Sequence, residues 1–329
     1  MEYRSVGRSG LVVSALGLGC NNFSARVDQA GATAIVDACF DAGVTFFDTA
    51  DAYGDSEVLL GRALRGRRDD AVVATKFGLD LRGRLGPSWR ARGSRSYVRR
   101  AVESSLRRLG TDHIDLFQQH VPDPATPLEE TLSALDELVH EGKVRYVGCS
   151  NLPAWRLADA HWTAVRAGLT PFTCSQNRYH LLDRAVEADL VPACRHFGLG
   201  LIAYFPLANG LLTGKYRPGA PLPAGARLTD NAVPWRVHRP DRPAELSDDN
   251  LARVDRLQRF AADRGLSVLQ LALGGLLARP GVSTAIAGAT SPEQVRANAD
   301  AAAWAAGDPA VHRQLWQLLD HLDDEDTAA

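Results

Sequence analysis

Three ionisable residues of this chain each come at the end of a short apolar run, and a tyrosine lies close to the first of them. Asp48 follows two phenylalanines, Lys76 follows the run Ala71–Thr75, and His120 closes a further run; Tyr53 lies five residues beyond Asp48. Any one of them alone could cap a turn, end a strand in water or be a satisfied core histidine. Their recurrence at the ends of consecutive candidate strands indicates one shared site.

Lys76 indicates how such a site would work. A buried ammonium is costly unless it is paired, and Asp48 on the neighbouring run is its natural partner. A phenol titrates at about 10 in water, and a nearby cation lowers its pKa. We therefore expect Tyr53 to donate a proton near neutral pH, with His120 able to supply a second hydrogen bond to the same oxygen.

These residue types are typical of carbonyl reduction. No nucleophile accompanies the tyrosine, so hydride would come from elsewhere and Tyr53 would protonate the developing alkoxide. A metal-assisted lyase or isomerase is the alternative. It would need several carboxylates or histidines at strand ends, where Asp48 and His120 stand nearly alone, and the sequence contains no H-x-H.

The elements that must position these residues alternate along the chain. Strands are expected at Ala15–Gly19, Val44–Phe47, Ala71–Thr75, Ile114–Gln118, Val144–Val147, Phe172–Ser175, Gly200–Ala203 and Ser283–Ala287. Helices are expected at Asp28–Ala42, Ser56–Leu64, Tyr97–Leu109, Leu128–His140, Pro153–Arg166, Val186–Phe197 and Asn250–Arg264. This alternation predicts an α/β fold, a parallel (β/α)8 TIM barrel, as one domain over residues 1–329. A doubly wound sheet is not favoured, because Gly17-Leu18-Gly19 lacks a third glycine and opens no helix.

A barrel would bring the strand ends together at its C-terminal mouth. Two long connections, Gly78–Ser96 and Gly210–Asp249, are expected at the same mouth and would shape the pocket there. The runs Tyr3–Val6 and Leu11–Val13 predict an N-terminal β-hairpin that plugs the opposite end. The acidic tail, residues 323–329, is expected to be disordered.

The first long connection is rich in arginine. Its arginines are Arg82, Arg84, Arg90, Arg92 and Arg95. They could contact an anionic or phosphorylated substrate, or NADP, or they could form a solvated loop. The composition favours the solvated loop, because lysine occurs only three times among the 37 basic residues and arginine supplies the rest.

The overall composition is typical of a cytoplasmic globular protein. A net charge of −2 argues against a nucleic-acid partner. The five cysteines are widely spaced without a C-x-x-C, which argues against a disulfide framework or structural zinc and for a reducing compartment. The N-terminus has no apolar signal core, and no uncharged apolar run approaches the roughly 20 residues of a membrane helix.

Five motifs, in this order, resemble those of the aldo-keto reductase superfamily over essentially the whole chain. They are Phe47–Gly54, Ala74–Lys76, Gln119-His120, Val147–Asn151 and Gly288–Gln294. The segment Pro206–Tyr216 makes the chain most similar to the bacterial branch that is akin to potassium-channel β subunits.

The resemblance implies a catalytic tetrad of Asp48, Tyr53, Lys76 and His120, with Tyr53 as the general acid/base. It also implies an extended NADP, with the nicotinamide at the ends of the fifth to seventh strands and the adenosine end beside Gly288–Gln294. The residues that would hold the cofactor are Ser150, Asn151, Gln176, Tyr204, Leu207, Gly210, Leu212, Lys215, Gly288, Thr290, Gln294 and Asn298.

One departure from the family pattern concerns the cofactor. Relatives that prefer NADPH commonly carry Lys or Arg in the stretch corresponding to Gly288–Gln294, and this chain has neither there, although Arg296 lies nearby. NAD therefore stays open beside NADP.

The resemblance implies an NAD(P)H-dependent oxidoreductase that interconverts the carbonyl of an aldehyde, ketone or sugar and an alcohol. A sugar 1-dehydrogenase working in the oxidative direction is one alternative. A cofactor-sensing regulatory subunit is another, and the intact tetrad weighs against it.

Overall fold

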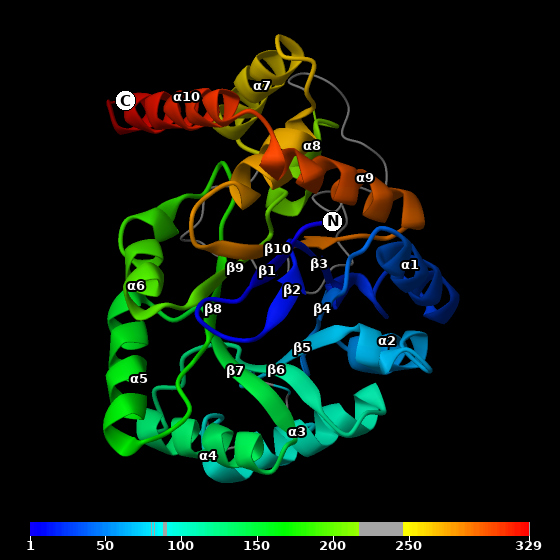
Figure 1. Cartoon of the computed structure of the whole chain (residues 1–329), viewed down its shortest axis with the longest axis vertical. Helices are drawn as coiled ribbons and strands as arrows, with labels where there is room; N and C mark the ends of the chain where they lie inside the picture. Colours follow the sequence, from blue (N-terminus) through cyan, green and yellow to red (C-terminus); the bar gives the residue numbers. More distant parts are fainter. Residues whose placement is uncertain (80, 82, 88–90, 217–245, 329) are drawn as a thin grey trace.

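The expected parallel strands form a closed barrel in the order β10-β3-β4-β5-β6-β7-β8-β9 (Figure 1). The structure, a computed structural model, describes residues 1–79, 81, 83–87, 91–216 and 246–328. The barrel strands are β3 (Leu16–Gly19), β4 (Phe46–Asp48), β5 (Val72–Phe77), β6 (Ile114–Gln119), β7 (Val144–Ser150), β8 (Cys174–Arg178), β9 (Gly200–Tyr204) and β10 (Val282–Gly288). The predicted (β/α)8 TIM barrel is thereby confirmed.

Helices surround the barrel (Figure 1). They are α1 (Gln29–Asp41), α2 (Ser56–Ala63), α3 (Arg95–Leu109), α4 (Leu128–His140), α5 (Ala154–Ala167), α6 (Leu190–Phe197), α7 (Asp248–Ala262), α8 (Val268–Gln270), α9 (Pro292–Ala303) and α10 (Pro309–Ala328). The expected tail at 323–329 overlaps the end of α10, and Ala329 lies outside the described residues. The disorder of that tail stays a prediction.

Several boundaries differ from expectation by a few residues, and two of these differences have a clear physical reason. The helix expected from Val186 is split: a 3-10 turn is followed by α6, which begins at Leu190, because Pro192 lacks an N–H and is tolerated only in a first turn. The strand expected to end at Val147 continues to Ser150 as β7. Gly148 permits this, because a Cβ there would lie 2.5 Å from Sγ of Cys174 on the next strand.

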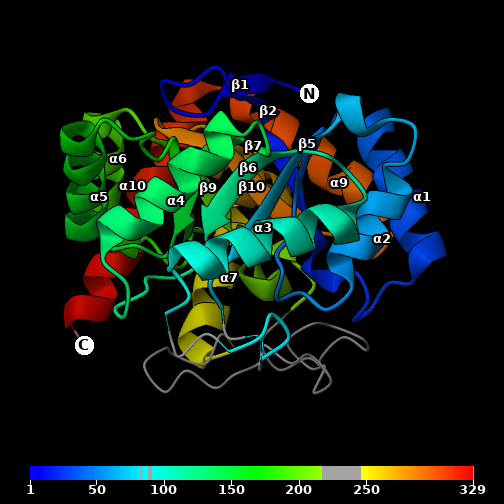
Figure 2. The same cartoon turned by 90° about the horizontal axis from the view of Figure 1, so that it is seen from below.

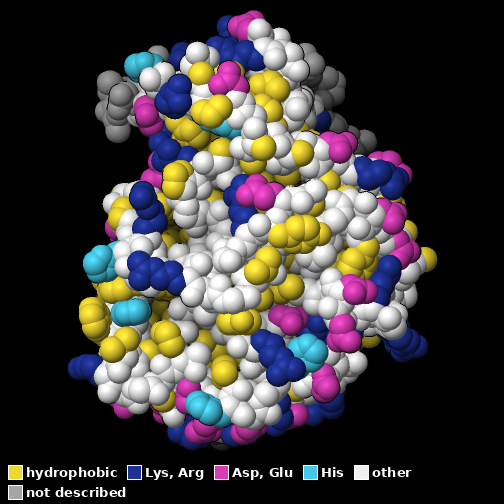
Figure 3. Space-filling model, in the orientation of Figure 1, with side chains coloured by type: hydrophobic (Ala, Val, Ile, Leu, Met, Phe, Trp, Pro, Cys, Tyr) yellow, Lys and Arg dark blue, Asp and Glu magenta, His cyan; other side chains and the backbone are white. Residues whose placement is uncertain are grey.

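The N-terminal hairpin closes one end of the barrel, as predicted. Its strands β1 (Tyr3–Ser5) and β2 (Val12–Ser14) are antiparallel, and Val6, Leu11 and Val13 join the apolar cluster inside the barrel. The space-filling view of this end shows atoms covering the barrel centre, with charged side chains scattered around it (Figure 3). A substrate must therefore enter from the other end.

The C-terminal mouth lies opposite the hairpin, and α7 projects beyond it (Figure 2). Most of the second long connection, and Arg82 and Arg90 of the first, lie outside the described residues. All five cysteines are free and buried. In the described part of the chain, no helix combines the length and apolar character needed to cross a bilayer.

The contact between α2 and α3 generates a stability prediction. A Cβ at Gly61 would lie 2.0 Å from the backbone oxygen of Leu109, whereas a Cβ at Gly31 of α1 would meet side-chain atoms only, Cγ1 of Val27 at 2.9 Å and Oδ1 of Asp28 at 3.3 Å. Helix propensity alone favours alanine at both positions by about 1 kcal/mol. We expect Gly61→Ala to lower the free energy of unfolding by about 1–3 kcal/mol, because the backbone must shift.

Urea denaturation of Gly61→Ala and Gly31→Ala checks this prediction, with Gly31→Ala as the matched control. If Gly61→Ala is as stable as the parent protein, the two helices do not pack as closely as described.

Candidate active site

The ends of three neighbouring strands carry the ionisable side chains of the expected site. Asp48 is the last residue of β4, Lys76 is the next-to-last of β5, and His120 follows β6. The parallel register pairs Asp48 with Ala74 and Lys76 with Gln118, so the three ends share one rim of the barrel. The barrel thus brings together residues that are far apart in the sequence.

Lys76 and Asp48 form a buried ion pair at the centre of this rim. The Lys76 side chain is fully buried, and its Nζ donates to Oδ1 of Asp48 at 2.6 Å and to the backbone oxygen of Thr49 at 2.8 Å. A buried ammonium needs such partners, because nothing else compensates the free energy of hydration that it loses. The predicted pairing is confirmed.

Tyr53 and His120 complete the group. Tyr53 lies in the turn between β4 and α2, and Nζ of Lys76 is 5.2 Å from the centre of its ring. The rings of Tyr53 and His120 meet edge to face, with centroids 5.8 Å apart. The four side chains of the expected tetrad are therefore mutual neighbours.

The pKa of Tyr53 differs from expectation. Burial raises it most, Lys76 lowers it through its charge and a hydrogen bond, Asp48 raises it again, and the net pKa lies above the ordinary value. The expected lowering by Lys76 is present, but it is outweighed because burial penalises phenolate and Asp48 offsets the cation. Tyr53 is thus a protonated donor at neutral pH.

Two neighbouring groups are held in single charge states. Burial, followed by the charge of Lys76, holds the pKa of His120 well below its usual range, so the imidazole is neutral. Burial lowers the pKa of Lys76, but Asp48 and Tyr53 raise it more, and the net pKa is raised. At neutral pH the site therefore combines an ammonium with two neutral donors.

Gln176 joins the tetrad to the barrel interior. Its Nε2 donates to Oδ2 of Asp48 at 2.8 Å and to Oε1 of Gln118 at 3.4 Å. The sequence analysis did not identify Gln118 as a site residue. Gln118 lies two residues after Leu116 on the same strand, so both side chains face the barrel interior. A polar residue at such an inward position could have revealed it. These contacts fix the orientation of the Gln176 amide beside the Asp48 carboxylate.

A second set of expected residues lies against His120. Asn151, with a left-handed φ of +60°, donates through Nδ2 to the backbone oxygen of His120 at 3.0 Å and to Oγ of Ser150 at 2.9 Å. The hydroxyl of Tyr204 donates to Oδ1 of Asn151 at 2.8 Å. Amide, hydroxyl and aromatic groups thus meet beside the tetrad.

The remaining expected cofactor residues form two further groups. One follows β9 around the short helix η4 (Ala208–Thr213) and contains Leu207, Gly210, Leu212 and Lys215. Burial lowers the pKa of Lys215, and the charge of Arg26 lowers it further. The sequence reading missed Arg26, which places a second cation near Lys215 and favours an anionic ligand.

The other group surrounds the start of α9. It contains Gly288, Thr290, Gln294 and Asn298. The side chain of Ser291 caps the helix by accepting from the backbone N–H of Gln294, and Oε1 of Gln294 accepts from the N–H of Thr290 at 2.9 Å. A capped helix N-terminus therefore lies at this end of the site.

These groups fit an extended nicotinamide dinucleotide. Ser150, Asn151 and Gln176 offer amide and hydroxyl groups next to the tetrad, where a carboxamide could bind. Lys215 and Arg26 suit a pyrophosphate, and a helix N-terminus suits a phosphate at the far end.

Known proteins are similar to this chain over nearly its whole length. The family model described as Aldo/keto reductase family matches residues 15–317. A probable voltage-gated potassium channel subunit beta of Oryza sativa subsp. japonica is 37% identical over 305 residues, covering 91% of this chain and 90% of that protein. An uncharacterized oxidoreductase of Bacillus subtilis, YrpG, is 36% identical over 306 residues, covering 90% and 89%. The L-glyceraldehyde 3-phosphate reductase of Escherichia coli K12 is 37% identical over 311 residues, covering 92% and 87%.

The buried ion pair generates a stability prediction. Asp48→Asn leaves the ammonium of Lys76 without its counter-charge, so we expect the free energy of unfolding to fall by about 3–5 kcal/mol. The double variant Asp48→Asn, Lys76→Met removes both charges and should recover most of this loss, because the remaining amide can still accept from Gln176.

Urea denaturation of both variants at neutral pH measures the two effects. A double variant less stable than Asp48→Asn would show that the loss in Asp48→Asn does not come from an uncompensated charge on Lys76.

Proposed function

The chain belongs to the aldo/keto reductase family, and from this premise we propose that Tyr53 is the general acid/base with which it reduces an aldehyde, ketone or sugar carbonyl. The protein is an NAD(P)-dependent oxidoreductase, which sets aside a metal-assisted lyase or isomerase. The observation that carries the proposal is the buried Lys76–Asp48 pair next to the Tyr53 phenol, with neutral His120 beside it.

In this proposal the substrate oxygen accepts hydrogen bonds from Tyr53 and His120. A nicotinamide held by Ser150, Asn151 and Gln176 would supply the hydride. Tyr53 transfers its proton to the oxygen as negative charge develops there, and Lys76 stabilises the phenolate that remains. Asp48 keeps Lys76 charged and in position, because its carboxylate balances the ammonium charge before and after the proton transfer.

The raised pKa of Tyr53 supports reduction as the neutral-pH direction. A phenol whose pKa lies above its ordinary value is fully protonated at pH 7, which is the form that donates. A sugar 1-dehydrogenase would need the phenolate as base, so its rate would rise with pH toward that pKa. The same residues could catalyse both directions, but the protonation state favours reduction.

The cofactor proposal rests on the three groups around the mouth. We assign the nicotinamide to Ser150, Asn151, Gln176 and Tyr204, and the pyrophosphate to the segment of Lys215. The distal end would lie at the N-terminus of α9, where Arg296 pairs with Glu293 at 3.2 Å. Because Gly288–Gln294 contains no Lys or Arg and the nearby Arg296 is paired, NADH is proposed beside NADPH.

A cofactor-sensing regulatory subunit is the second candidate, because a relative carries the name of a potassium channel β subunit. A sensor would bind the dinucleotide without turning over a carbonyl. The assembled tetrad supports the enzyme, since sensing alone does not require a proton donor. The free, buried cysteines support the expected cytoplasmic location.

Replacement of the proposed donor tests the function. We expect Tyr53→Phe to reduce kcat for 4-nitrobenzaldehyde by about 10²–10⁴-fold, because the proton donor is lost. The dissociation constant for NADPH, measured by fluorescence titration, should change little. Tyr146→Phe is the matched control, since the Tyr146 hydroxyl lies close to Gly10 in the hairpin region. Full activity in Tyr53→Phe would refute the assigned role.

Nucleotide preference is the second test. With no Lys or Arg in Gly288–Gln294 and with Arg296 paired, we expect the dissociation constants of NADPH and NADH to differ by less than about tenfold. Thermal unfolding at increasing concentrations of each nucleotide measures both constants, because a bound ligand raises Tm according to its affinity. A much larger preference for NADPH would mean that another cation binds the 2′-phosphate.

A further inference from the structure

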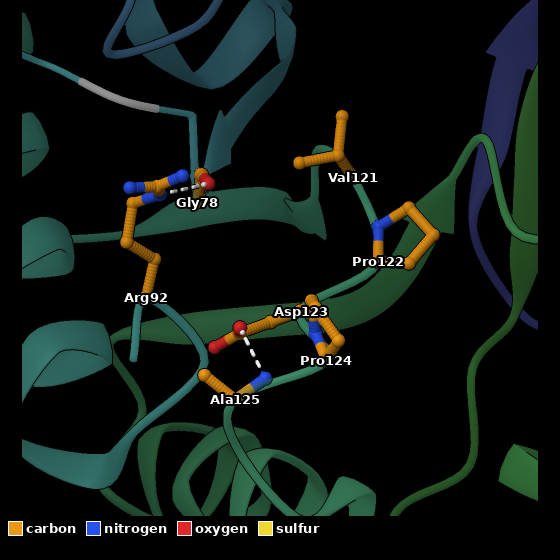
Figure 4. Close-up of a pocket in the computed structure, with 7 residues that line it drawn as sticks. All are labelled: Gly78, Arg92, Val121, Pro122, Asp123, Pro124 and Ala125. Atoms are coloured by element: carbon orange, nitrogen blue, oxygen red, sulfur yellow. Dashed lines mark hydrogen bonds between the residues drawn. The ribbon is translucent and has the colours of Figure 1, made fainter. Parts of the chain in front are cut away.

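The structure has a cavity of about 290 Å³ at the barrel mouth, beside His120, and a larger one of about 520 Å³ on the outer wall. The mouth cavity is lined by Gly78, Arg92 and the segment 121–125 (Figure 4). Its charged lining residues are Arg92 and Asp123, and Nε of Arg92 donates to the backbone oxygen of Gly78 at 3.1 Å. Opposite charges balance there, so the larger cavity is the stronger candidate for an additional ligand site.

The larger cavity lies between the C-terminal ends of α2 and α3, which are neighbours on the outside of the barrel (Figure 1). Helices of this fold run opposite to the strands, so these helix ends lie toward the hairpin and away from the tetrad. Its lining contains no Asp or Glu among the described residues. The arginines that line it are Arg62, Arg65, Arg68, Arg107 and Arg108.

Two of these arginines are already paired. Nε of Arg108 donates to Oε2 of the buried Glu57 at 2.6 Å. Nη2 of Arg68 donates to Oδ2 of Asp115 at 2.7 Å. Both guanidiniums are therefore fixed in the cavity wall, and with their carboxylates they add no net charge to it.

The other three arginines carry uncompensated charge. Arg62, Arg65 and Arg107 are exposed, and no hydrogen bond or ion pair joins their side chains to another described residue. Arg62 comes from the last turn of α2, Arg65 from the turn that follows it, and Arg107 from the last turn of α3. Three positive charges from two elements thus surround one cavity.

The carbonyl groups at the two helix ends do not use these charges. Carbonyls in a last turn lack intrahelical partners, and basic side chains there often interact with them. In α2, however, Nη2 of Arg67 donates to the backbone oxygen of Ala63 at 3.1 Å. In α3, the N–H groups of Gly110 and Thr111 both donate to the oxygen of Leu106. The three exposed guanidiniums therefore keep their donors for a ligand.

The charge and size of the cavity indicate a small polyanion. A phosphoryl group carries about −1.5 to −2 at neutral pH, so two such groups match three guanidiniums. Pockets for small ligands typically hold roughly 300–1,000 Å³, a range that includes this cavity. A nucleic acid is disfavoured, because Asp69 and Asp70 are exposed directly beyond Arg68 and the whole chain has a net charge of −2.

We propose that this cavity is a second ligand site, which binds a small organic bisphosphate through Arg62, Arg65 and Arg107. A planar guanidinium matches phosphate oxygens through paired N–H donors, and the two helix ends would each hold part of the ligand. The site is separate from the tetrad and from the groups assigned to the cofactor. The inference therefore goes beyond the proposed function and does not depend on it.

Calorimetric titration of the protein saturated with NADH tests the site. The bound nucleotide occupies the phosphate positions proposed at Lys215 and α9. The probes are myo-inositol 1,4-bisphosphate, myo-inositol 1-phosphate and myo-inositol, which have no carbonyl to be reduced. We expect the bisphosphate to bind about tenfold more tightly than the monophosphate, because it adds hydrogen bonds to charged groups. Uncharged myo-inositol should not bind.

Substitution of single arginines locates the bound ligand. Arg62→Gln and Arg107→Gln should each raise the dissociation constant of the bisphosphate about tenfold, since each removes a charged donor from one side of the cavity. Arg166→Gln is the matched control. Arg166 is also exposed in the last turn of a helix, α5, but it does not line the cavity, so the constant should stay unchanged. Urea denaturation should show similar stability in all three variants, because these side chains are on the surface.

Four results would overturn the inference and leave the proposed function untouched. The first is a bisphosphate that does not bind at millimolar concentration. The second is a monophosphate that binds as tightly as the bisphosphate. The third is a dissociation constant that Arg62→Gln and Arg107→Gln leave unchanged, which would mean that the anion binds elsewhere. The fourth is an equal loss in Arg166→Gln, which would reduce the effect to net charge.

Discussion

The site depends on one interaction, the buried ion pair between Lys76 and Asp48. An ammonium with no solvent exposure is stable only if a carboxylate and hydrogen-bond acceptors are already in place. Asp48 and the backbone oxygen of Thr49 meet that need, and both come from the end of β4. The ion pair can form because β4 and β5 are neighbours in the closed barrel. The site therefore depends on this strand order for its electrostatics.

The same burial sets the chemistry of the neighbouring groups. Without water, phenolate and imidazolium are both disfavoured, so Tyr53 and His120 are neutral hydrogen-bond donors. Lys76 does not bring the pKa of Tyr53 below its ordinary value in the resting site, because burial outweighs the charge of Lys76 and Asp48 offsets part of it. In the proposed mechanism, Lys76 contributes when Tyr53 loses a proton, since the phenolate then forms next to a fixed cation and little reorganisation is needed.

Much of the fold and the tetrad could be predicted from local sequence, and the exceptions have local causes. Strand and helix alternation revealed the barrel because apolar periodicity is a property of each segment alone. The true end of β7 depends on Gly148 passing close to Cys174 of the next strand, and no pattern within β7 reveals that contact. Gln118 was missed because its role exists only through Gln176, which comes from a different strand.

The sequence by itself determined that a lysine ends an apolar strand and that an acid ends the strand before it, which together require a buried charge pair. Only the tertiary structure decided what the arginines of the first long connection do. Arg92 and Arg95 are three positions apart, yet one lines a cavity beside His120 and the other pairs with α4. A loop has no periodicity from which side-chain direction can be read, so its contacts depend on the elements that the folded chain packs against it.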